Sequence, residues 1–146
     1  MAHSICEVYI HMVFSTKDRY PFLRQEWQAD LYAVTGKIIK NIGGQPIKIN
    51  GMENHVHILM KMPKEMDLAA LARTVKANSS RWIHQNHQSK FAWQEGYAVF
   101  SVAASNLSNV KSYIENQEEH HKVKSYEEEI RAMLIAVGLN PEEHMI

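Results

Sequence analysis

Two histidines that flank a single apolar residue are the first candidates for chemistry in this sequence. His55 and His57 lie on either side of Val56, within a run at residues 54–60 that is otherwise typical of a buried strand. Because successive strand side chains point to opposite faces, both imidazoles project from one face and Val56 from the other. Two neutral imidazoles form half of a metal site, and Mg²⁺ or Mn²⁺ would need further oxygen ligands. The alternative is a pair of polar positions on a half-exposed strand.

A tyrosine and a glutamine further along the chain could complete such a site. Tyr113 and Gln117 are four residues apart in a predicted helix, so their side chains share one face. Gln117 could offer its carbonyl oxygen as a third ligand, and Tyr113 could hold its hydroxyl beside whatever the metal binds. The alternative for Tyr113 is a core residue with its hydroxyl at the edge of the core.

Three further histidines could support these groups. His120 and His121 follow Gln117 by three and four residues, so one of them could assist a ligand or contact a phosphate. His11 is in the middle of a predicted strand and could lie behind the two-histidine pair on the same face of the sheet. A purely structural role is the alternative for each.

Candidate nucleic-acid contacts occur in one predicted helix and in the loop after it. Arg73, Lys76 and Arg81 could hold phosphates, and Trp93 could stack on an unpaired base. The alternative for the three cations is a solvated helix face.

Hydrophobic periodicity indicates the elements that must position these residues. Alternation predicts strands at residues 8–15, 47–50, 55–62 and 97–104, with a tight turn or bulge at residues 51–54. Helical spacing predicts helices at residues 21–41, 67–82, 106–121 and 126–138, the last with a capping box of Ser125 and Glu128. Residues 84–96 have no clear period and indicate a long loop.

The order of these elements is that of the ferredoxin-like (RRM-like) α+β fold. Its antiparallel sheet carries two helices on one face, which Val56 and Ile58 would contact. His55 and His57 would then emerge on the opposite face, and the tyrosine-bearing helix at residues 106–121 is expected to cover it.

The composition restricts the class of protein. The 146 residues, 45% of them hydrophobic, fit a single domain at residues 1–146 with a core at about residues 5–124. The one cysteine, Cys6, excludes a disulfide framework and favours a cytoplasmic location. No apolar run approaches the roughly 18 residues that a membrane span requires, and no secretory signal is recognisable. The formal net charge of zero argues against bulk, non-specific binding of nucleic acid.

Four segments together resemble the HUH single-tyrosine transposases of insertion sequences and their relatives associated with repetitive extragenic palindromes. They occur in the family's order and are YIHMVFSTK at residues 9–17, NHVHIL at 54–59, WQEGYAVFSV at 93–102 and YIENQEEHH at 113–121. One departure is Asn54, where an aspartate often precedes the first histidine, although that residue is not a ligand in the family pattern.

The resemblance implies metal-dependent cleavage and rejoining of single-stranded DNA. Tyr113 matches the family's nucleophile, which forms a 5′-phosphotyrosine link, and the matching metal ligands are His55, His57 and Gln117, for Mg²⁺ or Mn²⁺. DNA hairpins at the ends of an element are the implied substrates and a homodimer the implied acting form, with the polar residues 105–109 as a hinge.

Related branches of HUH enzymes match less well. Relaxases place a third histidine soon after the pair, and residues 59–64 contain none. Replication initiators typically place a lysine three residues after the tyrosine, where this chain has Asn116. Two alternatives stay open: a domesticated relative that processes chromosomal palindromic repeats, and a non-catalytic module that binds single-stranded nucleic acid.

Overall fold

The structure is a computed structural model and describes residues 3–146. One antiparallel sheet has the strand order β2-β3-β1-β4. Its strands are β1 (Tyr9–Ser15), β2 (Gln45–Met52), β3 (His55–Lys61) and β4 (Ala98–Val102). The helices are α1 (Gln25–Asn41), α2 (Leu68–Asn86), α3 (Leu107–Glu115), α4 (Gln117–His120), α5 (Tyr126–Ala136) and α6 (Pro141–His144), with short 3₁₀ turns η1 (Lys17–Arg19) and η2 (Ala104–Asn106). This arrangement confirms the predicted ferredoxin-like α+β fold.

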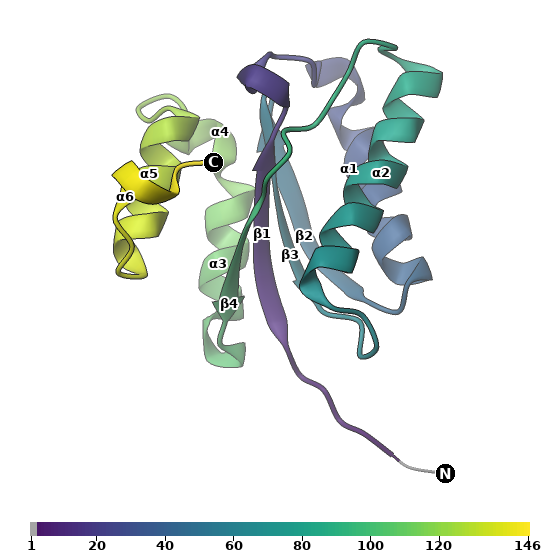
Figure 1. The fold of residues 1–146 in the computed structure, drawn as a ribbon, viewed down its shortest axis with the longest axis vertical. Helices are drawn as coiled ribbons and strands as arrows, with labels where there is room; N and C mark the ends of the chain where they lie inside the picture. The colour runs from purple at the N-terminus through teal and green to yellow at the C-terminus, as the bar shows by residue number, and fades with distance from the viewer. Residues whose placement is uncertain (1–2) are drawn as a thin grey trace.

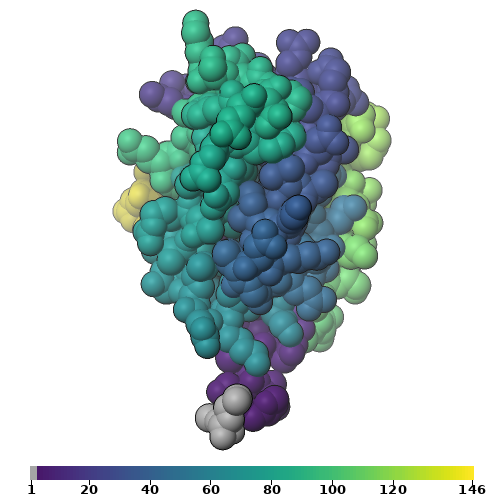
Figure 2. All heavy atoms as spheres, turned by 90° about the vertical axis from the view of Figure 1, so that its right-hand side faces the viewer, coloured from purple at the N-terminus to yellow at the C-terminus, as the bar shows by residue number. Residues whose placement is uncertain are grey.

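The main core lies between one face of the sheet and the helices α1 and α2 (Figure 1). Val56 and Ile58 point into it, as the alternation in β3 predicts. The helices contribute apolar stripes, in which Trp27, Leu31, Leu71 and Val75 lie as their spacing predicts. Towards the helix ends the fully buried residues are Ile39 and Ile83, one position after the predicted Ile38 and Trp82, which are only partly buried. Figure 2 shows the outer surface that α1 and α2 form over this side of the sheet.

The opposite face of the sheet is covered by the C-terminal helices (Figure 1). The helices α3 and α4 contact β2, and α3 also contacts β3. A second apolar cluster joins Val13 of β1 to Tyr126, Ile130 and Leu134 of α5. The tyrosine-bearing helix therefore covers this face of the sheet, as predicted, and α5 covers part of it as well.

The single helix predicted at residues 106–121 is wrong, because the structure has two helices there. The helix α3 ends at Glu115. The backbone of the next residue, Asn116 (φ −96°, ψ 24°), departs from helical geometry, and α4 follows. The side-chain amide of Asn50 donates hydrogen bonds to the backbone carbonyl oxygens of Ile114 (2.9 Å) and Glu115 (3.3 Å). Those oxygens would otherwise accept hydrogen bonds from the next helical turn, so the neighbouring strand competes with the helix at this point.

The hairpin that leads into the two-histidine strand is tighter than the sequence predicts. The strand β2 extends to Met52, beyond the predicted residues 47–50, and pairs with His55, so only Glu53 and Asn54 form the turn. A Cβ atom on Gly51 would lie 2.1 Å from the backbone oxygen of His55. The glycine is therefore required for the two strands to approach each other where the histidines begin.

Other boundaries also differ from the prediction. The helix α1 begins at Gln25 rather than at residue 21, and β2 begins at Gln45 rather than at residue 47. The helix α2 continues to Asn86 into the predicted loop, β4 is shorter than residues 97–104, and α6 was not predicted. The capping box of Ser125 and Glu128 at the start of α5 is confirmed. None of the helices within residues 3–146 combines the length and the apolar character that crossing a lipid bilayer demands.

Candidate active site

His55 and His57 lie side by side beneath the C-terminal helices. Both side chains are fully buried, with 0% exposure, and their ring centroids are 5.1 Å apart. The period of two in β3 places them on the face opposite Val56 and Ile58. The pair is therefore enclosed on the side of the sheet where Figure 1 shows α3, α4 and α5, and it forms the floor of a polar cluster there.

The predicted helical partners also lie in this cluster. The side-chain oxygen of Gln117 is 3.0 Å from Nε2 of His55, although Gln117 belongs to α4 rather than to the helix of Tyr113. The hydroxyl of Tyr113 donates a hydrogen bond to the carboxylate of Glu129. The four residues predicted as nucleophile and ligands thus meet around one point.

That point is occupied by Glu129 of α5, which sequence reasoning missed. Its Oε1 atom lies 3.0 Å from Nε2 of His57, 3.2 Å from Nε2 of His121 and 3.3 Å from Nε2 of His55. Its Oε2 atom accepts a hydrogen bond of 2.9 Å from the side-chain amide of Gln117. With only 1% exposure, the carboxylate is a buried charge that is held by polar groups from three elements.

The sequence does contain a signal for Glu129. The buried stripe of α5 consists of Tyr126, Ile130 and Leu134, and Glu129 lies on the same stripe. Carboxylates are rarely fully buried unless they have partners, so a glutamate at an apolar position of an amphipathic helix indicates a polar cluster beneath it.

The electrostatics of the cluster depend on this carboxylate. Burial disfavours its ionised form, but hydrogen bonds from His121, His55 and His57 outweigh burial and hold the pKa of Glu129 well below its usual range. Burial, together with the hydrogen bond to Glu129, raises the pKa of Tyr113. At neutral pH the metal-free site therefore contains an ionised Glu129 and a protonated Tyr113.

The cluster has the donor atoms of a metal site. His55, His121 and Glu129 each offer one ligand atom, and these atoms all lie within 4.8 Å of one another. Nε2 of His57 lies 3.0 Å from Oε1 of Glu129, and the side-chain oxygen of Gln117 lies 3.0 Å from Nε2 of His55. Imidazole nitrogens combined with carboxylate and amide oxygens suit a divalent cation, so these residues could hold one.

The remaining predicted histidines contact the cluster from outside. Nε2 of His11 lies 2.8 Å from Nδ1 of His57 across the two neighbouring strands. The ring of His120 stacks on Tyr113 with centroids 4.4 Å apart. Its Nε2 atom is buried and has no hydrogen-bond partner among residues 3–146.

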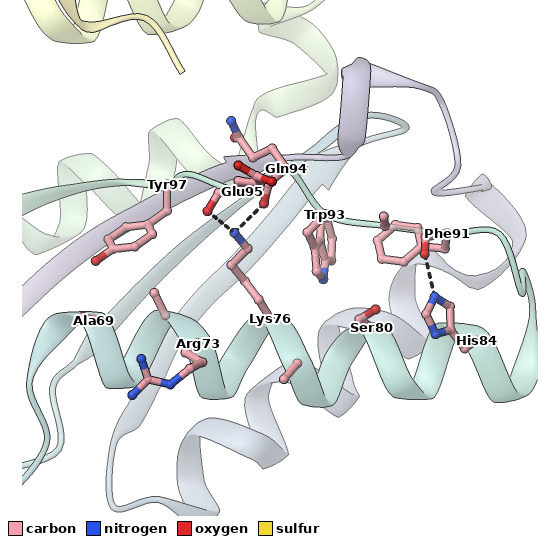
Figure 3. A pocket seen from close by; sticks show the side chains of 13 residues that line it. Ala69, Arg73, Lys76, Ser80, His84, Phe91, Trp93, Gln94, Glu95 and Tyr97 are labelled. Carbon is pink, nitrogen blue, oxygen red and sulfur yellow. Dashed lines mark hydrogen bonds between the residues drawn. The ribbon is translucent and has the colours of Figure 1, made fainter.

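The four candidate DNA contacts lie outside the polar cluster. Three of them surround a cavity of about 520 Å³ between α2 and residues 91–97 (Figure 3). The ammonium of Lys76 donates to the backbone oxygens of residues 94, 95 and 96, at 2.5, 3.1 and 3.1 Å. The indole of Trp93 donates to Ser79 at 3.0 Å, and Arg73 lines the same cavity. Arg81 is exposed on α2 and does not line it. The cavity is on the α2 side of the sheet, away from Tyr113.

Acidification is expected to destabilise the metal-free protein through His11, because burial and the neighbouring His57 lower its pKa from 6.5 to about 3. The unfolded chain binds this proton below pH 6.5, and the folded chain only near pH 3, so stability falls as the pH falls through this window. At pH 5 the loss is about 2 kcal/mol relative to pH 7. Urea unfolding in EDTA at both pH values should show a larger loss for wild type than for His11→Phe, and equal losses would contradict a neutral His11.

Comparisons with known proteins agree with this architecture. A family model described as "Transposase IS200 like" matches residues 4–117. The crystal structure of a "putative transposase" from Deinococcus radiodurans R1 is 21% identical, with a TM-score of 0.63 over 80% of this chain and 95% of that chain. The structure of a REP-associated tyrosine transposase bound to a REP hairpin is 14% identical, with a TM-score of 0.61 over 83% of this chain and 72% of that chain. No curated protein sequence matches the chain.

Proposed function

This chain belongs to the IS200-like transposase family, and we propose that it cleaves single-stranded DNA and transfers the cut strand through a covalent 5′-phosphotyrosine link. One observation carries the proposal: the hydroxyl of Tyr113 contacts the same buried carboxylate as His55 and His57. A phosphate held at the imidazoles would therefore lie within reach of the tyrosine oxygen, which is the alignment that attack requires.

In the proposed reaction, the oxygen of Tyr113 attacks the scissile phosphorus. A bond forms between the tyrosine and the 5′-phosphate, the bond from phosphorus to the 3′-oxygen breaks, and a free 3′-hydroxyl leaves. A free tyrosine has a pKa near 10, and burial raises the pKa of Tyr113 further, so its proton needs an acceptor. In the closed site Oε2 of Glu129 accepts a hydrogen bond from this hydroxyl. When DNA takes the place of Glu129, the proton passes through water to the leaving 3′-oxygen, which completes the 3′-hydroxyl. The link conserves the bond energy, so a second strand end can be joined without a nucleotide cofactor.

His55, His57 and Gln117 are the proposed ligands of Mg²⁺ or Mn²⁺, with Glu129 and His121 beside them. A divalent cation at this place would supply charge neutralisation for the scissile phosphate and its leaving oxygen. Three neutral ligands leave the full double charge of the cation available. The carboxylate of Glu129 would cancel part of that charge. A phosphate would therefore interact most strongly with the cation when the phosphate takes the place of Glu129.

Access to the site requires a movement of the cover. The side chains of His55, His57 and Gln117 are each 0% exposed, so a phosphodiester cannot contact them in the observed arrangement. Glu129 and the helix α5 cover them, and α5 is attached to the sheet through the small cluster around Val13. We propose that α5 moves away when DNA binds.

The proposed substrate is a single strand with a hairpin, as at the ends of an insertion sequence. One structural relative has been solved with a REP hairpin bound, which supports hairpins as the recognised shape here. A homodimer is the proposed acting form, since excision and joining involve two strand ends and each chain supplies one Tyr113.

Strand cleavage is expected to depend strictly on a divalent cation. End-labelled single-stranded hairpin DNA would be incubated with the protein in Mg²⁺ or Mn²⁺ and resolved on a denaturing gel. We expect a covalent protein–DNA adduct that disappears in EDTA and returns when Mn²⁺ is added in excess. A matched strand without the hairpin serves as the control. Binding of hairpins without any adduct in either metal would instead favour the non-catalytic module.

A further inference from the structure

We propose that His11 and Asn54 are positioning residues, which accept the Nδ1 protons of His57 and His55 and so stabilise the one tautomer that leaves both Nε2 atoms free when a cation binds. The inference rests on the proposed function, because it assigns these residues a role toward the proposed metal site. Neither side chain contacts the point where the proposed ligands meet. Each acts on one histidine from behind.

The two contacts have the same geometry. Nδ1 of His55 lies 2.8 Å from Oδ1 of Asn54, and Nδ1 of His57 lies 2.8 Å from Nε2 of His11. In both rings the other nitrogen, Nε2, faces the site, 3.0 Å from Gln117 for His55 and 3.0 Å from Glu129 for His57. Each imidazole therefore has one nitrogen held from behind and one nitrogen directed at the cluster.

The chemistry of a neutral imidazole then determines where its proton lies. Such a ring carries one proton, and a nitrogen that binds a cation cannot carry it. In the cation-bound site both protons must therefore be on Nδ1, and each needs an acceptor, whereas in the metal-free site the Nε2 atoms face the acceptor oxygens of Gln117 and Glu129 and donate to them. Oδ1 of Asn54 accepts the first, and Nε2 of His11 accepts the second, which places the proton of His11 on its own Nδ1.

The strand pairing builds the contact with His11. In the antiparallel pair of β1 and β3, His57 lies opposite Val13, and His11 lies opposite Leu59. His11 and His57 are thus diagonal neighbours on one face, within reach of each other's rings. Their rings stack with centroids 5.0 Å apart, and His11 is only 5% exposed. The contact is therefore buried from solvent and closely packed.

Both acceptors are uncharged, which has a consequence for metal affinity. A carboxylate that accepts from a ligating histidine raises the basicity of the ring, whereas an amide oxygen or an imidazole nitrogen does so less. Asn54→Asp should therefore tighten metal binding, and removal of either acceptor should weaken it.

Two measurements test the inference. Long-range ¹H–¹⁵N NMR spectra of the ¹⁵N-histidine-labelled protein saturated with Mg²⁺, which is diamagnetic, report the tautomer of each ring in the cation-bound site, and we expect His55 and His57 with the proton on Nδ1. Titration with Mn²⁺, followed by its EPR signal, should give a dissociation constant about 10–100-fold weaker for His11→Phe and for Asn54→Ala. His11→Gln, which restores an acceptor, should recover part of the loss, and Asn54→Asp should bind more tightly than wild type. His87→Phe, whose ring stacks on Trp27 away from the site, is the control.

The outcomes separate this inference from the proposed function. If wild type binds Mn²⁺ and a folded His11→Phe binds it equally well, the positioning role of His11 is refuted. If wild type binds no Mn²⁺, the proposed metal site fails and the positioning role falls with it. If wild type binds the cation but either ring is protonated on Nε2 in the Mg²⁺-saturated protein, the inference alone is overturned. Should His11→Phe not fold, the same spectrum and the Asn54 variants provide the decision.

Discussion

Tyr113→Phe is expected to abolish the covalent protein–DNA adduct and to reduce strand cleavage by about a thousandfold or more. The substitution removes only the proposed attacking oxygen and its hydrogen bond to Glu129, and it keeps the ring that stacks on His120. Binding of hairpin DNA should persist, because the candidate DNA contacts on α2 and in the loop after it are unchanged. A denaturing gel measures the adduct, and a native gel measures binding.

A second tyrosine of the same cluster provides the matched control. The ring of Tyr126 lies 4.7 Å from that of His55, and its hydroxyl points to Gln94, 3.4 Å away. Tyr126→Phe should therefore form the adduct as wild type does. An adduct in Tyr113→Phe, or its loss in Tyr126→Phe alone, would assign the nucleophile to another residue. Equal activity of wild type and Tyr113→Phe in every assay would favour the non-catalytic alternative.

Glu129→Gln is expected to lower the free energy of unfolding of the metal-free protein by about 3 kcal/mol, because it removes one partner of a buried charged cluster. The carboxylate accepts hydrogen bonds from Tyr113 and Gln117 and contacts three imidazoles. A carboxamide has the same shape but carries no charge, and its N–H₂ group would face some of the groups that now donate to the carboxylate. Urea denaturation in EDTA, at constant pH, measures the difference.

An exposed glutamate supplies the control for this change. Glu119 of α4 pairs only with Lys122 at the surface, where ion pairs contribute little. Glu119→Gln should leave the midpoint of unfolding unchanged. A stability of Glu129→Gln equal to or above that of wild type would show that the carboxylate does not hold α5 on the sheet. The movement proposed for α5 would then have to begin at another contact.

The two substitutions address one feature of the site. The proposed nucleophile and the proposed ligands all contact Glu129, so the arrangement that encloses Tyr113 is also the one that DNA would have to open. Loss of Tyr113 removes the chemistry and leaves the cover in place, whereas loss of Glu129 loosens the cover and leaves the nucleophile in place. Comparison of the two variants therefore separates catalysis from access.

Local sequence patterns predicted much of the fold and of the candidate site. The alternation in β3 determined that His55 and His57 share a face, because the direction of a strand side chain depends only on its position along the strand. The helical spacing of Tyr113 and Gln117 indicated a common direction, and Ser125 with Glu128 indicated the start of α5. The order of strands and helices determined the fold class.

Only the tertiary structure decided which groups meet at the site. The contact of His11 with His57 depends on the register of β1 against β3, which residues far apart in the chain determine together. The break at Asn116 depends on Asn50 of another strand, and the position of Glu129 depends on how α5 packs on Val13. A local pattern specifies the direction of a side chain relative to its own element. The partner that it contacts is specified by packing between elements, where a buried carboxylate is stable only if several distant donors converge on it.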